Sequence, residues 1–364
     1  MNPMPPSSSP SLPPAPPETA RTADACAGWR VERVDATGST NADLLAAFAD
    51  AAAPIRPRLQ ALPAPLSWQE ACTHFPPVAR RARRQSAGRG RLGRPWVSTP
   101  GNSLLFSLGI VMPRPLSALS GLSLAVGVAV LDGLRRLPLT QPGRLGLKWP
   151  NDILLDDAKL GGILIESAAS APHATALVIG IGLNLRGDIV LATPPADAPG
   201  TAPALRPAVL ASVLPADETW IGNLDAPTGV PSSDTPEAPG AMDALPHDAS
   251  DALPEAALAG ILAALDVALA RFAAEGLGPF RDRWWADHRF AARAVSILDH
   301  GREQLRGTAV GIDAAGRLLI APDAAGDAPR GPLQAVTAGD VSLRLAPDAT
   351  VPSATPSSDT DARA

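Results

Sequence analysis

A set of apolar stretches constrains the fold of this chain more than any other feature. Residues 104–111 and 176–184 have the length and aliphatic content of strands buried on both faces. Residues 153–155 and 159–166, separated by two aspartates, predict a hairpin between them. Strands of this kind need apolar cover on both faces, so we expect a sheet packed against helices.

The other elements complete an α+β arrangement. A strand is expected at residues 29–34, a capped helix from Ser39–Asn41 to about Ala53, and apolar helices at 116–137 and 255–275. Short alternating strands then predict a small barrel, at residues 294–297, 307–312, 317–320 and 341–345.

Three segments have the composition of disordered chain. Residues 1–25 and 347–364 are rich in Pro with Ser or Thr, and we expect disordered tails. Residues 187–254 are rich in Pro and acidic side chains, which predicts a mostly disordered insertion, with a short helix at 208–214, that the protein's activity does not need. The domain plan is then 26–290, interrupted by this insertion, followed by 291–346.

Composition limits the location and the class of function. The net charge of −5 argues against a general polyanion binder. Cys26 and Cys72 provide no disulfide framework, and the five histidines form no metal motif, so we expect a cytoplasmic protein without a resident metal. The N-terminus lacks an apolar signal core, and no membrane helix is expected.

Lysine is almost absent from this arginine-rich chain. Of 31 basic residues, only Lys148 and Lys159 are lysine. Lysine is a compact point charge with rotatable donors, which the planar guanidinium of arginine cannot replace. We therefore expect at least one of these lysines to be functional.

A glycine–arginine run at residues 85–96 (QSAGRGRLGRPW) suits an anionic ligand. Backbone N–H groups of glycine-rich loops bind anions, and guanidinium groups bind phosphate and carboxylate. Residues 71–131 contain no acidic side chain but several arginines, which predicts a positive field beside a nucleoside triphosphate. A basic segment that binds nucleic acid is the alternative for both features.

Five motifs in order give this chain a family resemblance. They are GSTN at 38–41, the run at 85–96, KWPND at 148–152, KLGGILIE at 159–166 and GIGLN at 180–184. The set resembles biotin–protein ligases over residues 29–187 and, more weakly, over 255–345. The resemblance implies a mixed sheet with helices, similar to class II aminoacyl-tRNA synthetases and lipoate ligases, followed by an SH3-like barrel.

The resemblance also implies a reaction. Such an enzyme joins biotin and ATP, with Mg²⁺ carried by ATP, into biotinyl-5′-AMP and pyrophosphate. It then transfers biotin to a lysine of a biotin carboxyl carrier protein, part of acetyl-CoA carboxylase or a related carboxylase. The stretch before Gly38 is proline-rich and shorter than the ~60 residues of a small domain. We therefore expect a ligase that binds no specific DNA and no membrane, and edge strands of the sheet could pair in a homodimer.

Position by position, the resemblance assigns site residues in three groups. The catalytic residues would be Lys159, Arg91 and Arg89. The biotin site would comprise Ser39, Thr40, Asn41, Gln85, Arg89, Gly90, Arg91, Lys159, Gly161 and Gly162. The ATP and adenylate site would comprise Arg89, Arg91, Arg94, Trp96, Lys148, Asn151 and Asn184, and Asp152 could contact Mg²⁺ or only turn the chain.

Other functions remain open from the sequence. A lipoate or octanoate ligase or transferase of the same fold is the first alternative. A nucleic-acid-binding module is the second, and a carrier-binding scaffold without activity is the third. Ser86 stands where threonine or a longer polar residue is common in the family. The link at 54–79 is longer and richer in proline than the family pattern, and the insertion at 187–254 has no counterpart in it.

Overall fold

The computed structural model describes residues 28–50, 52–98, 101–187, 205–216, 220, 251–299, 302–323, 331–338 and 341–346. The predicted tails, 1–25 and 347–364, lie outside the described residues, as does most of the predicted insertion.

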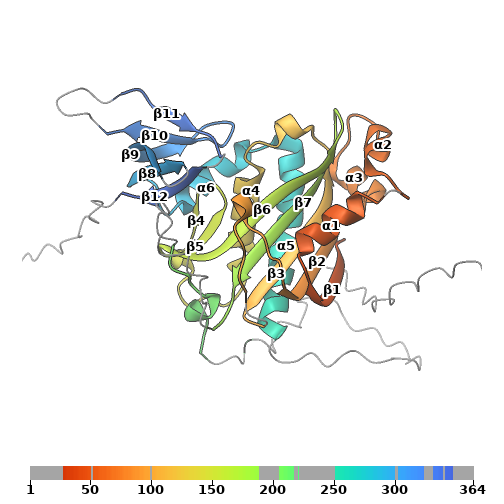
Figure 1. Cartoon of the computed structure of the whole chain (residues 1–364), viewed down its shortest axis with the longest axis horizontal. Coiled ribbons are helices and arrows are strands. Elements are labelled where there is room, and N and C mark those ends of the chain that lie inside the picture. The colour runs from red at the N-terminus through yellow and green to blue at the C-terminus, as the bar shows by residue number, and fades with distance from the viewer. Residues whose placement is uncertain are drawn as a thin grey trace, which may run out of the picture.

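A seven-stranded mixed sheet forms the larger part of the molecule (Figure 1). Its order is β1-β2-β3-β7-β6-β5-β4, and only β1 and β2 run parallel. The strands are β1 (Arg30–Thr37), β2 (Val78–Gln85), β3 (Ser103–Met112), β4 (Leu145–Lys148), β5 (Asp152–Leu155), β6 (Ala158–Ser170) and β7 (Thr175–Asn184). Every residue of β3 is buried, so the prediction of a doubly covered strand is confirmed.

Helices cover both faces of this sheet (Figure 1). On one face, α4 (Leu122–Leu134) packs against α5 (Ala252–Glu275), and α3 (Trp68–His74) contacts α5 and β3. On the other face lie α1 (Thr40–Phe48) and α2 (Ile55–Gln60), which contact β7 and β6. The helix predicted from residue 116 instead begins with a 3₁₀ turn at Leu116–Ala118, because Gly121 takes a left-handed conformation before α4.

The long apolar helix α5 belongs to the core. Its length and hydropathy would suffice to cross a membrane, but half of its most apolar window is buried inside the protein. Leu258, Ile261, Leu265 and Phe272 are buried against the rest of the main apolar cluster. This pattern is that of a central helix in a globular domain.

A second, smaller sheet follows the domain that contains the seven-stranded sheet. Helix α6 (Arg281–Asp287) leads into five antiparallel strands in the order β11-β10-β9-β8-β12. These are β8 (Ala294–Asp299), β9 (Arg302–Ile312), β10 (Leu318–Pro322), β11 (Gln334–Val336) and β12 (Val341–Leu345). The predicted small β domain is confirmed, while the short strand β11 was not anticipated.

Part of the predicted insertion is folded, and the short helix predicted at 208–214 is present as a 3₁₀ turn. Residues 205–216 pack onto the domain, and Leu210 and Val213 of a 3₁₀ turn (Leu210–Val213) are fully buried. The backbone N–H of Thr140 donates to the carbonyl of Val213 at 2.8 Å. The sequence indicated the helical turn, but its packing onto the domain was not predicted.

The two domains meet at buried aromatic groups. Trp149 is fully buried, and its indole N–H donates to the carbonyl of Gly316 in the second domain at 3.1 Å. His288 stacks on Trp284, and its Nδ1 lies 3.1 Å from the carbonyl oxygen of Leu147, which accepts a hydrogen bond. Burial lowers the pKa of His288 to about 4, so the ring is neutral at pH 7.

We therefore predict that His288 makes stability fall in acid. Its folded pKa lies below the ordinary value near 6.5, so from about pH 6.5 down to pH 4 the unfolded chain takes up a proton that the folded chain does not. Between pH 7.5 and pH 5 this costs about 2 kcal/mol of unfolding free energy. In urea unfolding at the two pH values, His288→Gln should lose about 2 kcal/mol less than the parent. His74→Gln, at an exposed histidine, is the control; an unchanged pH dependence in His288→Gln would contradict the assignment.

Candidate functional site

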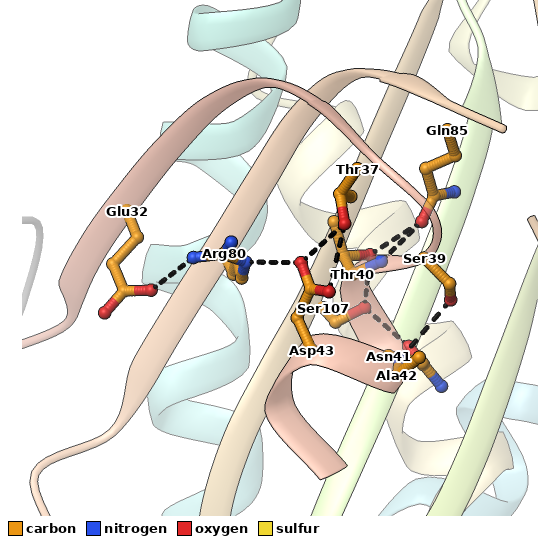
Figure 2. A network of polar contacts seen from close by, with 10 residues as sticks. All are labelled: Glu32, Thr37, Ser39, Thr40, Asn41, Ala42, Asp43, Arg80, Gln85 and Ser107. Atoms are coloured by element: carbon orange, nitrogen blue, oxygen red, sulfur yellow. Dashed lines mark hydrogen bonds and ion pairs between the residues drawn. The ribbon is translucent and has the colours of Figure 1, made fainter. Parts of the chain in front are cut away.

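The N-terminus of α1 presents a polar network to the sheet (Figure 2). Ser39 is the N-cap of α1, and its hydroxyl accepts the backbone N–H of Ala42. The backbone N–H and the hydroxyl of Thr40 both donate to Oε1 of Gln85, at 2.7 and 3.1 Å. Residues 45 positions apart in sequence are thereby joined, as the motif assignment expects.

A buried hydroxyl extends this network and was missed from the sequence. Ser107, in the middle of β3, lies 2.6 Å from the hydroxyl of Thr40 and donates to Oδ1 of Asn41. Asn41 in turn donates to Glu166 of β6 at 2.7 Å. The sequence signal for Ser107 is a polar residue in the middle of an otherwise apolar strand.

An ion-pair chain holds the start of α1 in place. Asp43 accepts from the hydroxyl of Thr37 at 2.8 Å and from Nε of Arg80 at 2.8 Å. Arg80 also donates to Glu32 at 3.0 Å. Burial works against the charge of Arg80, but its bonds to Asp43 and Glu32 raise its pKa overall.

Two further arginines of β2, Arg81 and Arg83, are also paired, which weakens the predicted positive field. Arg81 contacts Asp251 at 2.7 Å and also bonds Glu255, and Arg83 lies 3.6 Å from Asp251. Both acids come from the start of α5 and its N-cap, far outside the acid-free window. Of the arginines in residues 71–131, those beside the candidate site therefore belong to the 85–96 loop.

That loop closes into a tight hairpin. The backbone N–H of Gly90 donates to the carbonyl of Arg94 at 2.7 Å, and the backbone N–H of Trp96 donates to the carbonyl of Gly88 at 2.9 Å. Arg89 pairs with Pro95 across the hairpin, is 45% exposed, and has its guanidinium 3.6 Å from Glu166. The hairpin thus directs Arg89 toward the carboxylate that also holds Asn41.

Glycines of β6 and β7 allow side chains to lie directly on the sheet. A Cβ added to Gly180 would lie 2.2 Å from Oδ1 of Asn41, and one added to Gly182 would lie 2.7 Å from the Trp96 indole. Trp96 also reaches Gly162, whose added Cβ would be 3.5 Å from the ring. The groups that pack on Gly180 and Gly182 are thus Asn41 and Trp96.

Gly161 differs from Gly162 in its surroundings. A Cβ on Gly161 would lie 2.4 Å from the side chain of Leu183 and 2.6 Å from the carbonyl of Gly182. Successive residues of a strand face opposite sides of the sheet. Gly162 therefore faces Trp96, whereas Gly161 permits the close approach of β6 to β7.

Both lysines of the chain share one carboxylate. Nζ of Lys148 lies 2.7 Å from one oxygen of Asp152, and Nζ of Lys159 lies 2.7 Å from the other. Burial alone would raise the pKa of Asp152, but the two ammonium groups hold it well below its ordinary value. Lys148 is buried, and burial lowers its pKa despite Asp152, while Lys159 is 34% exposed and also faces the Trp96 ring at 5.7 Å.

The two predicted asparagines fix the neighbouring backbone. Asn151 donates to the carbonyl of Ile163 at 2.8 Å and accepts from Arg91 at 3.2 Å. Asn184 is buried and donates to the carbonyl of Lys159 at 3.3 Å. Asn151 thereby connects the 85–96 loop to β6, the strand that carries Lys159, and Asn184 connects β7 to the same strand.

The second domain contributes a charge to this region. Arg344 of β12 lies close enough for its pKa to be affected by two groups of the site. Burial lowers the pKa of Arg344, Asp152 raises it and Arg94 lowers it further. Sequence reasoning assigned no site role to Arg344, because no local pattern indicates that β12 reaches the KWPND turn.

The Mg²⁺ contact expected at Asp152 stays a prediction. Each oxygen of Asp152 accepts a hydrogen bond from a lysine, and the described residues contain no group of three His, Cys, Asp or Glu side chains that could hold a metal ion.

A cavity of about 600 Å³ lies elsewhere, between Asp156, Asp157 and residues 206–209, and contacts none of the predicted site residues.

Two parts of the chain match known families. Residues 76–184 match the Biotin/lipoate A/B protein ligase family, and residues 293–344 match the Biotin protein ligase C terminal domain. The first match contains the 85–96 loop, both lysines and both predicted asparagines. The second contains Arg344.

Curated relatives and solved structures agree with these matches. The biotin–[acetyl-CoA-carboxylase] ligase of Mycobacterium tuberculosis is 40% identical over 43% of this chain, and the bifunctional ligase/repressor BirA of Escherichia coli is 30% identical over 72%. The chain spans 50% and 65% of the lengths of these relatives. The structure of the biotin protein ligase from Aquifex aeolicus in complex with biotin and ATP aligns with 87% of this chain and 99% of that one, with a TM-score of 0.51 and 21% identity, and shares its fold. Over residues 76–184 and 293–344 the chain is therefore similar to biotin protein ligases.

Proposed function

We propose that this chain activates biotin with ATP as biotinyl-5′-AMP and transfers the biotinyl group to a lysine of a carrier protein. The observation that carries the proposal is the order of groups along one face of the sheet. Mostly neutral hydrogen-bonding groups, with the carboxylate of Glu166 on Asn41, gather at Gly180, and Lys159 faces the Trp96 ring that lies on Gly182. Two residues along a strand span about 7 Å, so a small elongated ligand would meet both.

The neutral end suits the ureido ring of biotin. A ureido group has one carbonyl acceptor and two N–H donors and carries no charge. Ser39, Thr40, Asn41 and Ser107 are buried polar residues at this end, and Gln85 is bonded to Thr40. These groups bond to one another in this structure, so a ligand that separates them must supply donors and acceptors of its own or leave them unpaired.

The cationic end suits two anions that must react. In the first step a carboxylate oxygen of biotin bonds to the α-phosphorus of ATP, and the bond from that phosphorus to the bridging oxygen breaks, releasing pyrophosphate. Arg89, Arg91 and Lys159 would screen the repulsion of the two anions and stabilise the charge that builds up. In this proposal Trp96 and Asn184 bracket the adenine, with Arg94, Lys148 and Asn151 nearby.

In the second step the neutral amine of a carrier lysine attacks the acyl carbon of the anhydride. The acyl–oxygen bond breaks, AMP leaves with the electron pair, and the amine nitrogen loses a proton as the amide forms. The names of the relatives support acetyl-CoA carboxylase or a related carboxylase as the carrier. The proposal includes a cytoplasmic location and no specific DNA target. Mg²⁺ would arrive with ATP.

Substrate choice tests this proposal. With Mg-ATP and biotin, the protein should release about one pyrophosphate per chain in a single turnover. Lipoate offers a dithiolane ring without ureido donors and should give at least a hundredfold slower release, because buried polar groups stay unpaired. Equal rates with the two acids would favour the lipoate alternative. Salt-dependent binding of RNA without any pyrophosphate release would favour the nucleic-acid alternative.

Lys159→Arg tests the proposed charge role. A guanidinium keeps the charge but is broader than an ammonium, and misplacing one preorganised donor costs ~3 kcal/mol, or about a hundredfold in rate. Single-turnover pyrophosphate release should therefore fall about a hundredfold while the melting temperature changes little, because Lys159 is 34% exposed. Lys148→Arg should instead lower the melting temperature, because Lys148 is buried. If Lys159→Arg reacts within threefold of the parent, Lys159 does not have this role.

A further inference from the structure

The folded part of the acidic stretch lies against the strand that carries Lys159. Residues 205–216 are anchored by the buried side chains of Leu210 and Val213. The backbone N–H of Ala211 donates to the carbonyl of Leu185 at 2.9 Å. This anchor fixes the segment on the sheet independently of any contact with Lys159.

Both backbone hydrogen bonds of Lys159 go to this segment. Its N–H donates to the carbonyl of Arg206 at 2.7 Å, and its carbonyl accepts from the N–H of Ala208 at 2.8 Å. Pro207, between them, forms a parallel bridge with Lys159. Strand β7 pairs with β6 only from Gly161 onward, so residues 206–208 take the place of β7 at the start of β6.

The opposite side of Lys159 is less well held. Its partner on β5 is Leu154, and the register between β5 and β6 shifts directly before Leu154. The remaining backbone contact is the amide of Asn184, which reaches the Lys159 carbonyl at 3.3 Å. The backbone position of Lys159 therefore depends chiefly on residues 206–208.

We propose that residues 206–208 are a positioning segment, which holds Lys159 through its backbone so that the ammonium meets the reacting anions. The proposal rests on the proposed adenylation activity. It reverses the expectation that the whole acidic stretch is dispensable. Small displacements of a preorganised charge cost rate while leaving the binding of a neutral group elsewhere unchanged. The segment should thus affect adenylation and not the binding of biotin's ureido ring.

Ala208→Pro tests the segment, because proline lacks the N–H that the Lys159 carbonyl accepts. Ala211→Pro is the matched control: it removes an N–H of the same segment that bonds Leu185 instead. Ala208→Pro should slow single-turnover pyrophosphate release about 10- to 100-fold, keep the dissociation constant of biotin within threefold, and lose no more thermal stability than Ala211→Pro. Hydrogen exchange at the Lys159 amide should become faster in Ala208→Pro only.

Should Ala208→Pro not fold, Pro207→Gly loosens the same bridge without removing a donor and should slow release at least threefold. Pyrophosphate release by Ala208→Pro within twofold of Ala211→Pro would overturn the inference while leaving the proposed function intact, and so would a parallel loss of biotin binding. A parent protein that releases no pyrophosphate from biotin and ATP would refute the proposed function instead. Exchange at the Lys159 amide would then still report whether the segment holds this residue.

Discussion

The carboxylate of Asp152, shared by Lys148 and Lys159, is the interaction on which the rest of the site depends. An ion pair with this little exposure is stable only if every charge has a partner, because removing one partner leaves a buried charge without compensation. The pair ties the end of β4 to the starts of β5 and β6. The same turn carries Trp149 into the second domain, so this charge cluster also determines where that domain sits.

The second constraint is the close approach of side chains to the backbone of β6 and β7. Gly180 and Gly182 have no Cβ, which lets Asn41 and Trp96 lie on the sheet. A larger residue at Gly182 would displace the indole and with it the ring that Lys159 faces. Polar recognition at one glycine and anion chemistry beside the next therefore follow from the same strand.

Much of the fold could be predicted from sequence, because β3, β5, β6 and β7 are local apolar runs whose pattern needs no distant partner. Strand β2, with four arginines, has no such pattern and was not predicted. Motif order brought the N-terminus of α1, the loop and both lysines into one site. Pairing over long sequence distances could not be predicted. The sequence around Arg81 predicts an unpaired cation, but in the structure Arg81 forms an ion pair with Glu255 of α5. Ser107 and Arg344 were missed for the same reason: the groups that Ser107 bonds, and those that affect the pKa of Arg344, come from distant elements.

The folded stretch at 205–216 shows how composition can mislead. Proline and acid content over 60 or more residues predicts disorder correctly only on average. Two apolar side chains, Leu210 and Val213, suffice to anchor a short segment once a pocket between β7 and the β4 region exists. Such a segment stabilises the sheet through backbone bonds, which any sequence can provide.

Mass spectrometry of the protein after mixing with biotin and Mg-ATP tests the central claim most directly. With the carrier absent, the account predicts one biotinyl-5′-AMP retained per chain under native conditions, and its transfer when a biotin carboxyl carrier protein is added. Recovery of unchanged biotin and ATP from a folded parent protein would contradict the account.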